Sequence, residues 1–142
     1  MEPILIAYWS GMGHTEAMME AIANGIKEAG GTVEIMGPAD YDARKVASYS
    51  KLLFGCPAMG DEQLEEGDFE PFFTEVEGSL SGKKVGLFGS YDWNDGQWML
   101  DWGYRVSNRG AQLFDDGLAI KASSDVDVNQ ICNEWGKNFA AF

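Results

Sequence analysis

The chain has 142 residues, of which 45% are hydrophobic, so it is long and apolar enough for one folded domain and is not disordered. Its 23 acidic and 10 basic residues give a formal net charge of −13, which disfavours nucleic acid and anionic membranes and favours basic protein partners. No basic segment precedes the first apolar run, and no run approaches the roughly 18 residues of a membrane span. We expect one cytoplasmic domain, residues 1–142.

In chain order, residues 3–9 (PILIAYW) form a nearly all-apolar run that predicts a strand covered on both faces. Residues 15–31 carry an apolar helical stripe that ends at Gly30-Gly31. The next segments predict a strand, a weak helix and a third strand that ends before Pro57, at residues 32–36, 42–49 and 51–56.

The second half continues the alternation after an acid-rich loop. The pattern predicts a helix, a strand and another helix at residues 68–78, 83–91 and 97–109. A fifth strand is expected within 111–120, with Asp115-Asp116-Gly117 as a candidate interruption. The last helix carries a core-facing stripe of Val128, Ile131, Cys132, Trp135, Phe139 and Phe142.

This alternation predicts an α/β fold, with a parallel sheet and helices on both of its faces. Ligands of such sheets bind beyond the carboxyl ends of the strands. The loops that begin near residues 10, 57 and 90 should therefore meet at one site.

Two cysteines, Cys56 and Cys132, lie far apart in the sequence and form no Cys-x-x-Cys pair. Free cysteines are among the most buried residue types. We interpret both as buried thiols.

The first of the three loops, SGMGHT at residues 10–15, does not match the common nucleotide-binding motifs. It lacks the Gly-Lys-Ser/Thr of a Walker loop, and Glu16 occupies the position of the third glycine of a dinucleotide fingerprint. Trp9-Ser10 stand where a response-regulator receiver has paired acids. These comparisons exclude three familiar classes of α/β protein.

The same loop does fit a nest of backbone amides that holds an anion. Gly11 and Gly13 let the amides bend inward, and the hydroxyls of Ser10 and Thr15 stand at the start of a helix. Charge-assisted hydrogen bonds contribute about 1.5–3 kcal/mol each, so several of them can hold a monophosphate without a lysine or arginine. An ordinary helix cap is the alternative interpretation.

The other two loops combine acids with aromatic residues. Residues 58–70 (AMGDEQLEEGDFE) hold six acids, and residues 89–98 (GSYDWNDGQW) bring Tyr91 and Trp93 beside small polar residues. Aromatic side chains in a loop suit a flat ring, and Met59 is a soft apolar partner for its other face. The alternative is that Trp93 only caps the edge of the sheet.

The segments SGMGHT, GCPAMGDE and LFGSYDWNDGQW, in this order and at this spacing, resemble the three flavin-contacting loops of short-chain bacterial flavodoxins. The similarity covers essentially the whole chain. It implies a flavodoxin-like, doubly wound, five-stranded parallel sheet in the order 2-1-3-4-5, with helices on both faces in three α/β/α layers. It also implies FMN bound without a covalent bond.

The resemblance further implies which residues contact FMN. Those around the phosphate would be Ser10, Gly11, Met12, Gly13, His14 and Thr15. Those on one side of the isoalloxazine would be Ala58, Met59, Gly60, Asp61 and Glu62. Those on the other side would be Ser90, Tyr91, Asp92 and Trp93, with Trp93 stacked on the ring.

The resemblance also implies a redox mechanism. The peptide after Gly60 would turn over on reduction, so that its carbonyl accepts a hydrogen bond from N5–H of a neutral semiquinone; glycine enters positive φ with little steric cost. Nearby carboxylates would repel the anionic hydroquinone and lower the second potential. The acids concerned are Asp61, Glu62, Asp92 and Asp95.

Some positions depart from the family pattern. Met12 stands where a hydroxyl residue is usual, and His14 where asparagine is usual. Residues 91–94 read Tyr-Asp-Trp-Asn instead of the common Tyr-Gly-Trp-Gly, and Ala122 replaces an asparagine that sometimes holds the ribityl chain. If the loop needs positive φ at position 92 or 94, the aspartate or asparagine there must adopt it.

These features favour a low-potential one-electron carrier without a substrate of its own. Its partners would be basic-surfaced reductases and oxidoreductases, bound transiently and sensitive to salt, and the protein would be a monomer. The alternatives are an FMN-dependent quinone or nitro reductase of the same fold, and a regulatory domain that has lost its flavin. No long insertion is present to build a substrate pocket.

Overall fold

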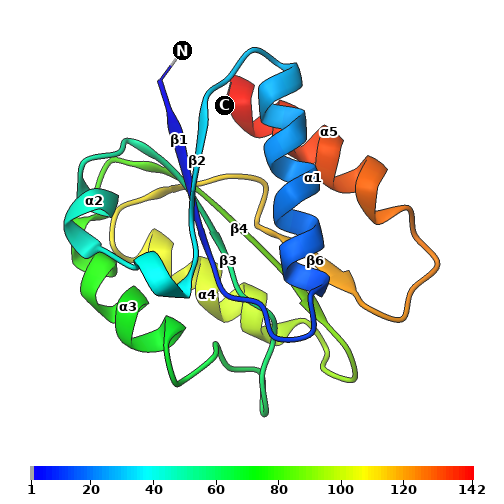
Figure 1. Ribbon diagram of the computed structural model, residues 1–142. Coiled ribbons are helices and arrows are strands. Elements are labelled where there is room, and N and C mark those ends of the chain that lie inside the picture. Colours follow the sequence, from blue (N-terminus) through cyan, green and yellow to red (C-terminus); the bar gives the residue numbers. More distant parts are fainter. Residues whose placement is uncertain (1) are drawn as a thin grey trace.

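A parallel sheet runs through the middle of the computed structural model, which describes residues 2–142 (Figure 1). The strand order is β2-β1-β3-β4-β5, β6 also pairs with β4, and every one of these pairings is parallel. The strands are β1 (Ile4–Tyr8), β2 (Val33–Met36), β3 (Lys51–Gly55), β4 (Lys84–Tyr91), β5 (Gln112–Leu113) and β6 (Leu118–Lys121). The order 2-1-3-4-5 expected from the sequence is confirmed.

The fifth position of the sheet is occupied by two short strands in series. Gln112 of β5 pairs with the start of β4, whereas Leu118 of β6 pairs with Phe88 further along the same strand. Between them, Asp115, Asp116 and Gly117 have φ values of 52°, 53° and 91°. Three successive left-handed residues cannot continue a strand, so the interruption predicted at this tripeptide is confirmed.

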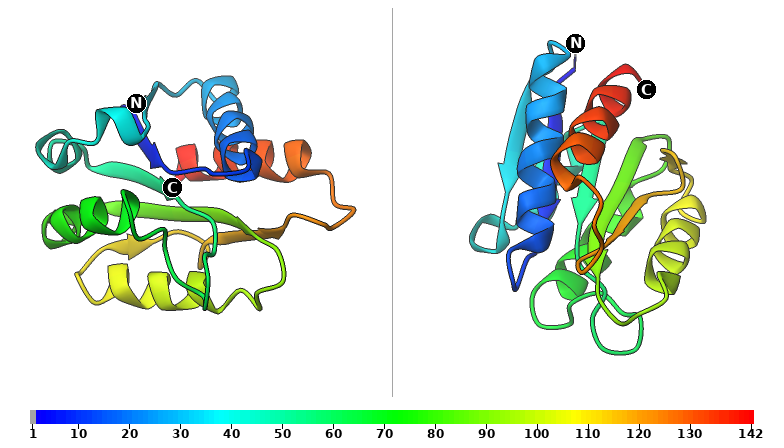
Figure 2. Two further views of the ribbon diagram at one scale, coloured as in Figure 1. Left: turned by 60° about the horizontal axis from the view of Figure 1, so that its bottom comes forward. Right: turned by 90° about the vertical axis from the view of Figure 1, so that its right-hand side faces the viewer.

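Helices cover both faces of the sheet (Figure 2). On one face α1 (His14–Glu28) and α5 (Val128–Ala141) lie side by side. The other face carries α2 (Ala43–Ala47), α3 (Phe69–Val76) and α4 (Gln97–Ser107), and short 3-10 turns occupy Pro38–Asp40 and Glu77–Ser79. None of these helices within residues 2–142 is long and apolar enough to cross a bilayer.

The period-two alternation of strand residues divides the core into two layers. In β1, Ile4 and Ile6 pack toward α1 and α5, whereas Leu5 and Ala7 pack toward α3 and α4. Glycines let α1 and α5 approach closely, because a Cβ on Gly25 would lie 2.0 Å from Asn133 O. This packing leaves the loops at the carboxyl ends of the strands free to form a site.

Candidate cofactor-binding site

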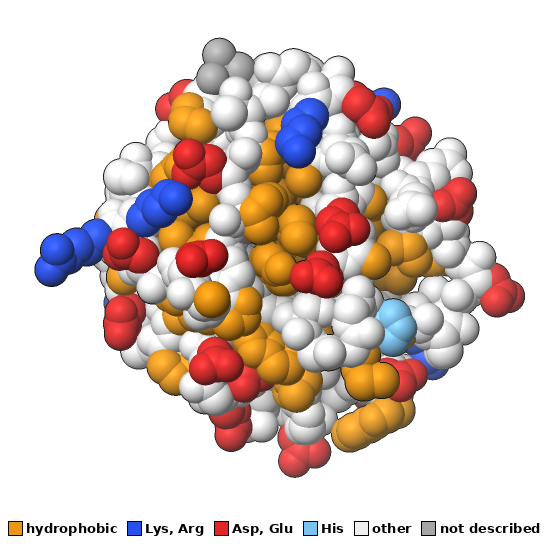
Figure 3. All heavy atoms as spheres, viewed as in Figure 1, with side chains coloured by type: hydrophobic (Ala, Val, Ile, Leu, Met, Phe, Trp, Pro, Cys, Tyr) orange, Lys and Arg blue, Asp and Glu red, His pale blue; other side chains and the backbone are white. Residues whose placement is uncertain are grey.

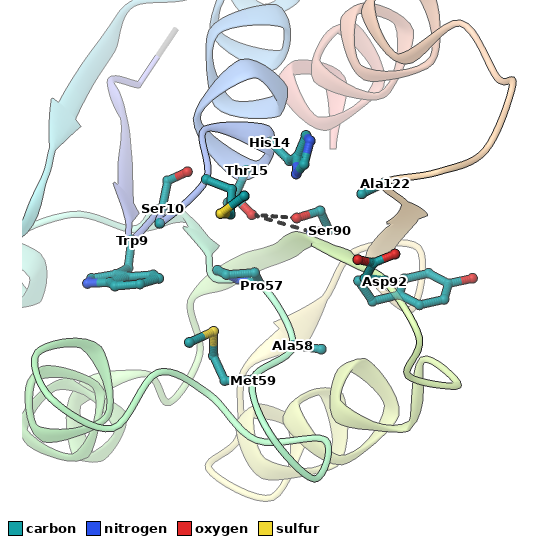
Figure 4. Close-up of a pocket in the computed structure, with 13 residues that line it drawn as sticks. Trp9, Ser10, His14, Thr15, Pro57, Ala58, Met59, Ser90, Asp92 and Ala122 are labelled. Atoms are coloured by element: carbon teal, nitrogen blue, oxygen red, sulfur yellow. Dashed lines mark hydrogen bonds between the residues drawn. The ribbon is translucent and has the colours of Figure 1, made fainter.

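A cavity of about 460 Å³ lies at the carboxyl ends of β1, β3 and β4 (Figure 4). The three loops that the sequence singled out, together with the end of β6, form its walls. The lining residues are Trp9, Ser10, Gly11, Met12, His14, Thr15, Pro57, Ala58, Met59, Ser90, Tyr91, Asp92 and Ala122. The predicted meeting of the three loops is confirmed.

The β1–α1 loop presents unpaired backbone donors to this cavity. The backbone N–H groups from Gly11 to Thr15 have no hydrogen-bond acceptor within residues 2–142. Gly13, at φ 94°, turns the chain into α1, and the hydroxyl oxygen of Ser10 accepts a hydrogen bond from Glu16 N–H at 3.2 Å. Ser10 therefore does act as a helix cap, while its own proton remains available to a ligand.

No lysine or arginine is among the residues that line the cavity. An anion held here would depend on backbone amides, hydroxyl groups and the positive end of the α1 dipole. A Cβ on Gly11 would lie 3.0 Å from the indole of Trp9, so a larger residue there would need this side chain to shift by a few tenths of an ångström.

The β1–α1 and β4–α4 loops are joined through two buried hydroxyls. Thr15 Oγ1 lies 3.1 Å from Ser90 Oγ, and Ser90 N–H also donates to Thr15 Oγ1 at 3.4 Å (Figure 4). Both side chains are buried. This contact fixes the first helical turn of α1 against the end of β4.

The β3–α3 loop begins with two backbone bonds that continue the sheet, from Cys56 N–H to Phe88 O and from Ala58 N–H to Ser90 O, both at 3.0 Å. Residues 59–63 then form a tight hairpin closed by mutual hydrogen bonds between Met59 and Gln63. Gly60 and Glu62 in this turn have φ values of 50° and 61°. The hairpin carries the exposed Met59 side chain at the cavity wall.

The β4–α4 loop supplies the opposite wall. Tyr91 is half-buried and packs on Trp98 with ring centroids 5.6 Å apart, and Asp92 is exposed at the cavity. Neither Asp92 nor Asn94 has positive φ, so this loop does not need glycine at either position. Instead Asn94 Nδ2 donates to Gly60 O at 3.0 Å.

Of the fifteen residues predicted to contact FMN, ten line the cavity. The five that do not are Gly13, Gly60, Asp61, Glu62 and Trp93. The Trp93 side chain is 74% exposed. Gly13 and Gly60 shape their loops through positive φ.

Glu62 joins two loops instead of facing the cavity. Its Oε2 accepts hydrogen bonds from the N–H groups of Gln97 at 2.8 Å and Asp95 at 3.3 Å, which caps the start of α4. Its Oε1 is buried and has no hydrogen-bond partner within the described chain. This oxygen is an acceptor that a ligand N–H could satisfy.

Sequence reasoning missed Trp9 and Pro57 as cavity residues, and it named Ala122 only as the replacement of a ribityl-binding asparagine, whereas Ala122 lines the cavity. Trp9 directly follows β1 and Pro57 lies two residues after the end of β3, and this position relative to the strand end was the signal that could have identified them. Trp9, Pro57 and Ala58 give the cavity an apolar wall.

Two further acids of residues 58–70, Glu65 and Glu70, have structural partners. Burial opposes ionisation of Glu65, but hydrogen bonds from the N–H groups of Phe69, Asp68 and Gly67 outweigh it and lower its pKa. Glu70 pairs with Arg105 at 2.7 Å, and the hydrogen bonds from this guanidinium lower its pKa. These two acids stabilise the scaffold and are not merely solvated.

Over the face seen in Figure 1, acidic side chains are widespread, basic ones are few, and hydrophobic surface shows between them (Figure 3). The exposed hydrophobic side chains near the cavity are Met12, Met59 and Trp93. Within residues 2–142, no cluster of three or more His, Cys, Asp or Glu side chains could hold a metal ion.

Both cysteines are buried and free, as the sequence predicted. Burial raises the pKa of the Cys56 thiol and raises that of Cys132 to about 12. Cys56 adjoins the β3–α3 loop and accepts a hydrogen bond from Glu65 N–H at 3.4 Å. Its thiol is therefore held in the neutral form.

The residues present fit FMN. The unpaired amides of the β1–α1 loop suit a phosphate monoester, and the apolar wall suits an isoalloxazine. No lining residue supplies the lysine that a triphosphate loop would require.

Comparison with known proteins supports the same assignment. The Flavodoxin family model matches residues 6–135. The chain is 51% identical to a flavodoxin of Megasphaera elsdenii over 132 residues, covering 93% of this chain and 94% of that one. It is 44% identical to a flavodoxin of Clostridium beijerinckii over 135 residues, covering 95% and 97%.

A solved structure agrees with these sequence matches. The two-electron reduced flavodoxin of M. elsdenii superposes with a TM-score of 0.87 and 45% identity, over 98% of this chain and 99% of that one. Fold, site geometry and sequence therefore lead to one conclusion: the chain belongs to the flavodoxin family.

Proposed function

We propose that this protein carries single electrons at low potential between redox proteins, with FMN held without a covalent bond in the cavity between the three loops. Family membership makes it an FMN-binding electron-transfer protein and not an enzyme with its own substrate. The single observation that best supports the proposed site is the row of unpaired amides from Gly11 to Thr15 at the start of α1.

The β1–α1 loop would bind the phosphate. Its five free N–H groups and the Ser10 hydroxyl proton provide the donors, and His14 and Met12 line the same wall. Gly13 contributes through its left-handed φ and not through a side chain. The Thr15 hydroxyl is already engaged by Ser90, so its main role is to fix the loop.

The walls would hold the ring. Ala58 and Met59 lie on one wall and Tyr91 and Asp92 on the other, with Ser90 buried between the loops. Trp93 can stack on a bound ring if its side chain turns toward the cavity, and an exposed side chain changes rotamer quickly.

Bound FMN would supply an isoalloxazine that accepts electrons one at a time. Carboxylates beside the cavity would make any added negative charge unfavourable. Asp92 lines the cavity, and Asp61 and Asp95 are exposed on the adjoining turns. These acids would lower the potential of the electron that makes the ring anionic.

The same acids would attract partners. We propose a cytoplasmic monomer that docks transiently with basic-surfaced reductases and oxidoreductases, in encounters that salt weakens. A net charge of −13 argues against nucleic acid and anionic membranes as partners.

Titration of the flavin-free protein with FMN, followed by mixing of the resulting complex with NADPH, tests the proposal. The protein should bind one FMN, quench its fluorescence and take up electrons in two separate steps during stepwise chemical reduction. Rapid direct reduction of the complex by NADPH would instead indicate a reductase, and failure to bind FMN would refute the proposed site.

A further inference from the structure

The loops after β3 and β4 are tied together beside the cavity by side chains from both loops. Asn94 Nδ2 donates to Gly60 O at 3.0 Å, and Glu62 Oε2 accepts from the N–H groups of Gln97 and Asp95. The two ties differ in what they hold. The Glu62 carboxylate binds the backbone N–H groups of two residues at the start of α4, whereas the Asn94 side chain binds the single carbonyl group of Gly60.

The Gly60–Asp61 peptide is held by one hydrogen bond, which comes from outside the hairpin. Mutual backbone bonds between Met59 and Gln63 close the turn at its base. Within residues 2–142, Asn94 Nδ2 is the one hydrogen-bond donor to Gly60 O. Gly60 has φ 50° and no Cβ, and even an added Cβ would meet only Gln63 Oε1, at 3.6 Å. The peptide can therefore turn without breaking the hairpin, but not without breaking the bond to Asn94.

We propose that Asn94 is a positioning residue that holds the Gly60 carbonyl away from the cavity in the oxidised protein and thereby lowers the potential of the first electron. The inference rests on the proposed function, in which bound FMN accepts electrons one at a time. On the first reduction, an electron from a partner and a proton from water would make flavin N5 an N–H donor. The hairpin adjoins the cavity through Met59, and its Gly60 carbonyl can accept from a new donor there only after leaving Asn94.

Asn94 and the flavin N5–H group would compete as donors to the Gly60 carbonyl, and this competition sets the direction in which Asn94 changes the first potential. In this proposal the bond between Asn94 and Gly60 belongs to the oxidised protein and would be lost after the first electron, so it would favour the oxidised state. Loss of one such bond changes an equilibrium roughly threefold to tenfold. The second electron finds the carbonyl already turned, so its potential is independent of Asn94.

Two neutral substitutions test the proposal. Asn94→Ala removes the donor without changing net charge, and Asn94 does not have positive φ, so alanine causes no backbone strain. Gln97→Ala is the control, because Gln97 lies in the same region. This variant loses the hydrogen bond from the Gln97 side-chain amide to Asp101, but the backbone N–H of residue 97 still donates to Glu62. Both positions lie in partly or fully exposed backbone outside the core, so both variants should fold.

In Asn94→Ala, we expect the ratio of the affinity for one-electron-reduced FMN to the affinity for oxidised FMN to rise threefold to tenfold. A tenfold rise corresponds to about +59 mV for one electron. The second potential and the affinity for oxidised FMN should change little, and Gln97→Ala should match the parent. In the flavin-free protein, the carbonyl ¹³C resonance of Gly60 should shift in Asn94→Ala alone.

Several results would overturn the proposal. An unchanged first potential would show that the bond only packs two loops together, and equal shifts of both potentials would indicate a general electrostatic effect. An equal response of Gln97→Ala would show that the effect is not specific to Asn94. Failure of the parent protein to bind FMN would refute the proposed function itself, which these three results leave intact.

Discussion

The hydroxyls of Thr15 and Ser90 lie 3.1 Å apart and join two loops that are 75 residues apart in the sequence. Both groups are buried, so neither can exchange its partner for water. The contact makes the shape of the phosphate loop depend on the end of β4.

Thr15→Val and Ser90→Ala should each lower the free energy of unfolding by about 1 kcal/mol. Thr15→Val leaves the Ser90 hydroxyl and N–H without this partner, and Ser90→Ala leaves Thr15 Oγ1 with only the backbone N–H of residue 90. The double variant should lose less free energy of unfolding than the sum of the two single losses, since the second substitution removes the hydroxyl that the first left without its partner. Chemical denaturation of the flavin-free protein measures all three. Strict additivity would show that the two hydroxyls do not interact.

Trp93→Ala should weaken FMN binding roughly twofold to tenfold, which corresponds to a stacking contribution of about 0.5–1.5 kcal/mol. Stability without flavin should be unchanged because Trp93 is 74% exposed. Tyr104→Ala is the matched control, since this aromatic residue of α4 is 66% exposed and does not line the cavity. Fluorescence titration with FMN gives the affinities, and equal losses in both variants would contradict stacking by Trp93.

Asp92→Asn and Asp92→Gly should raise the second one-electron potential by roughly 20–60 mV, because each removes a negative charge beside the cavity. Glu75→Gln removes the same charge from an exposed position near the end of α3 and should have little effect. Potentiometric titration at low ionic strength measures the shifts. A lower potential in either Asp92 variant would refute the electrostatic argument.

Neither thiol should react with a disulfide reagent at pH 8 while the protein is folded. Burial raises the pKa of Cys132 to about 12 and that of Cys56 also, so the reactive thiolate is scarce, and both side chains are inaccessible. In denaturant, both thiols should react immediately. Rapid labelling of one thiol in the native protein would show that this part of the structure opens readily.

Arg105→Met should destabilise the protein at pH 7 by about 1–3 kcal/mol, chiefly because the nearly buried Glu77 loses its closest partner, at 2.9 Å, and keeps only the more distant Arg109, at 3.5 Å. The hydrogen bonds from Arg105 lower the pKa of Glu70 and Glu77 below their ordinary value of 4.5. Groups with a lowered pKa stabilise the fold above their unfolded pKa, and this contribution is lost as the pH falls through the folded value.

Stability of the parent should therefore decline below about pH 4.5, and the decline should be shallower in Arg105→Met. Equilibrium unfolding between pH 3 and pH 7 checks both slopes. Parallel curves would show that this cluster does not govern the acid sensitivity.

The sequence by itself determined the elements and the place of the site. Apolar runs such as residues 3–9 and the helical stripe of α5 are set by burial, and burial repeats with the period of each element. Because strands and helices alternate, the carboxyl ends of β1, β3 and β4 had to share one edge. The three loops, the interruption at Asp115-Asp116-Gly117 and the buried thiols could therefore be predicted.

Only the tertiary structure decided which polar atoms find one another. Nothing in the pattern of residues 58–70 distinguishes Glu62, which caps α4, from Glu65, which caps α3. Nor does it pair Asn94 with the Gly60 carbonyl or Thr15 with Ser90. Periodicity reports whether a side chain is covered, but a hydrogen bond between distant loops depends on distances and angles that exist only after the sheet has brought those loops together.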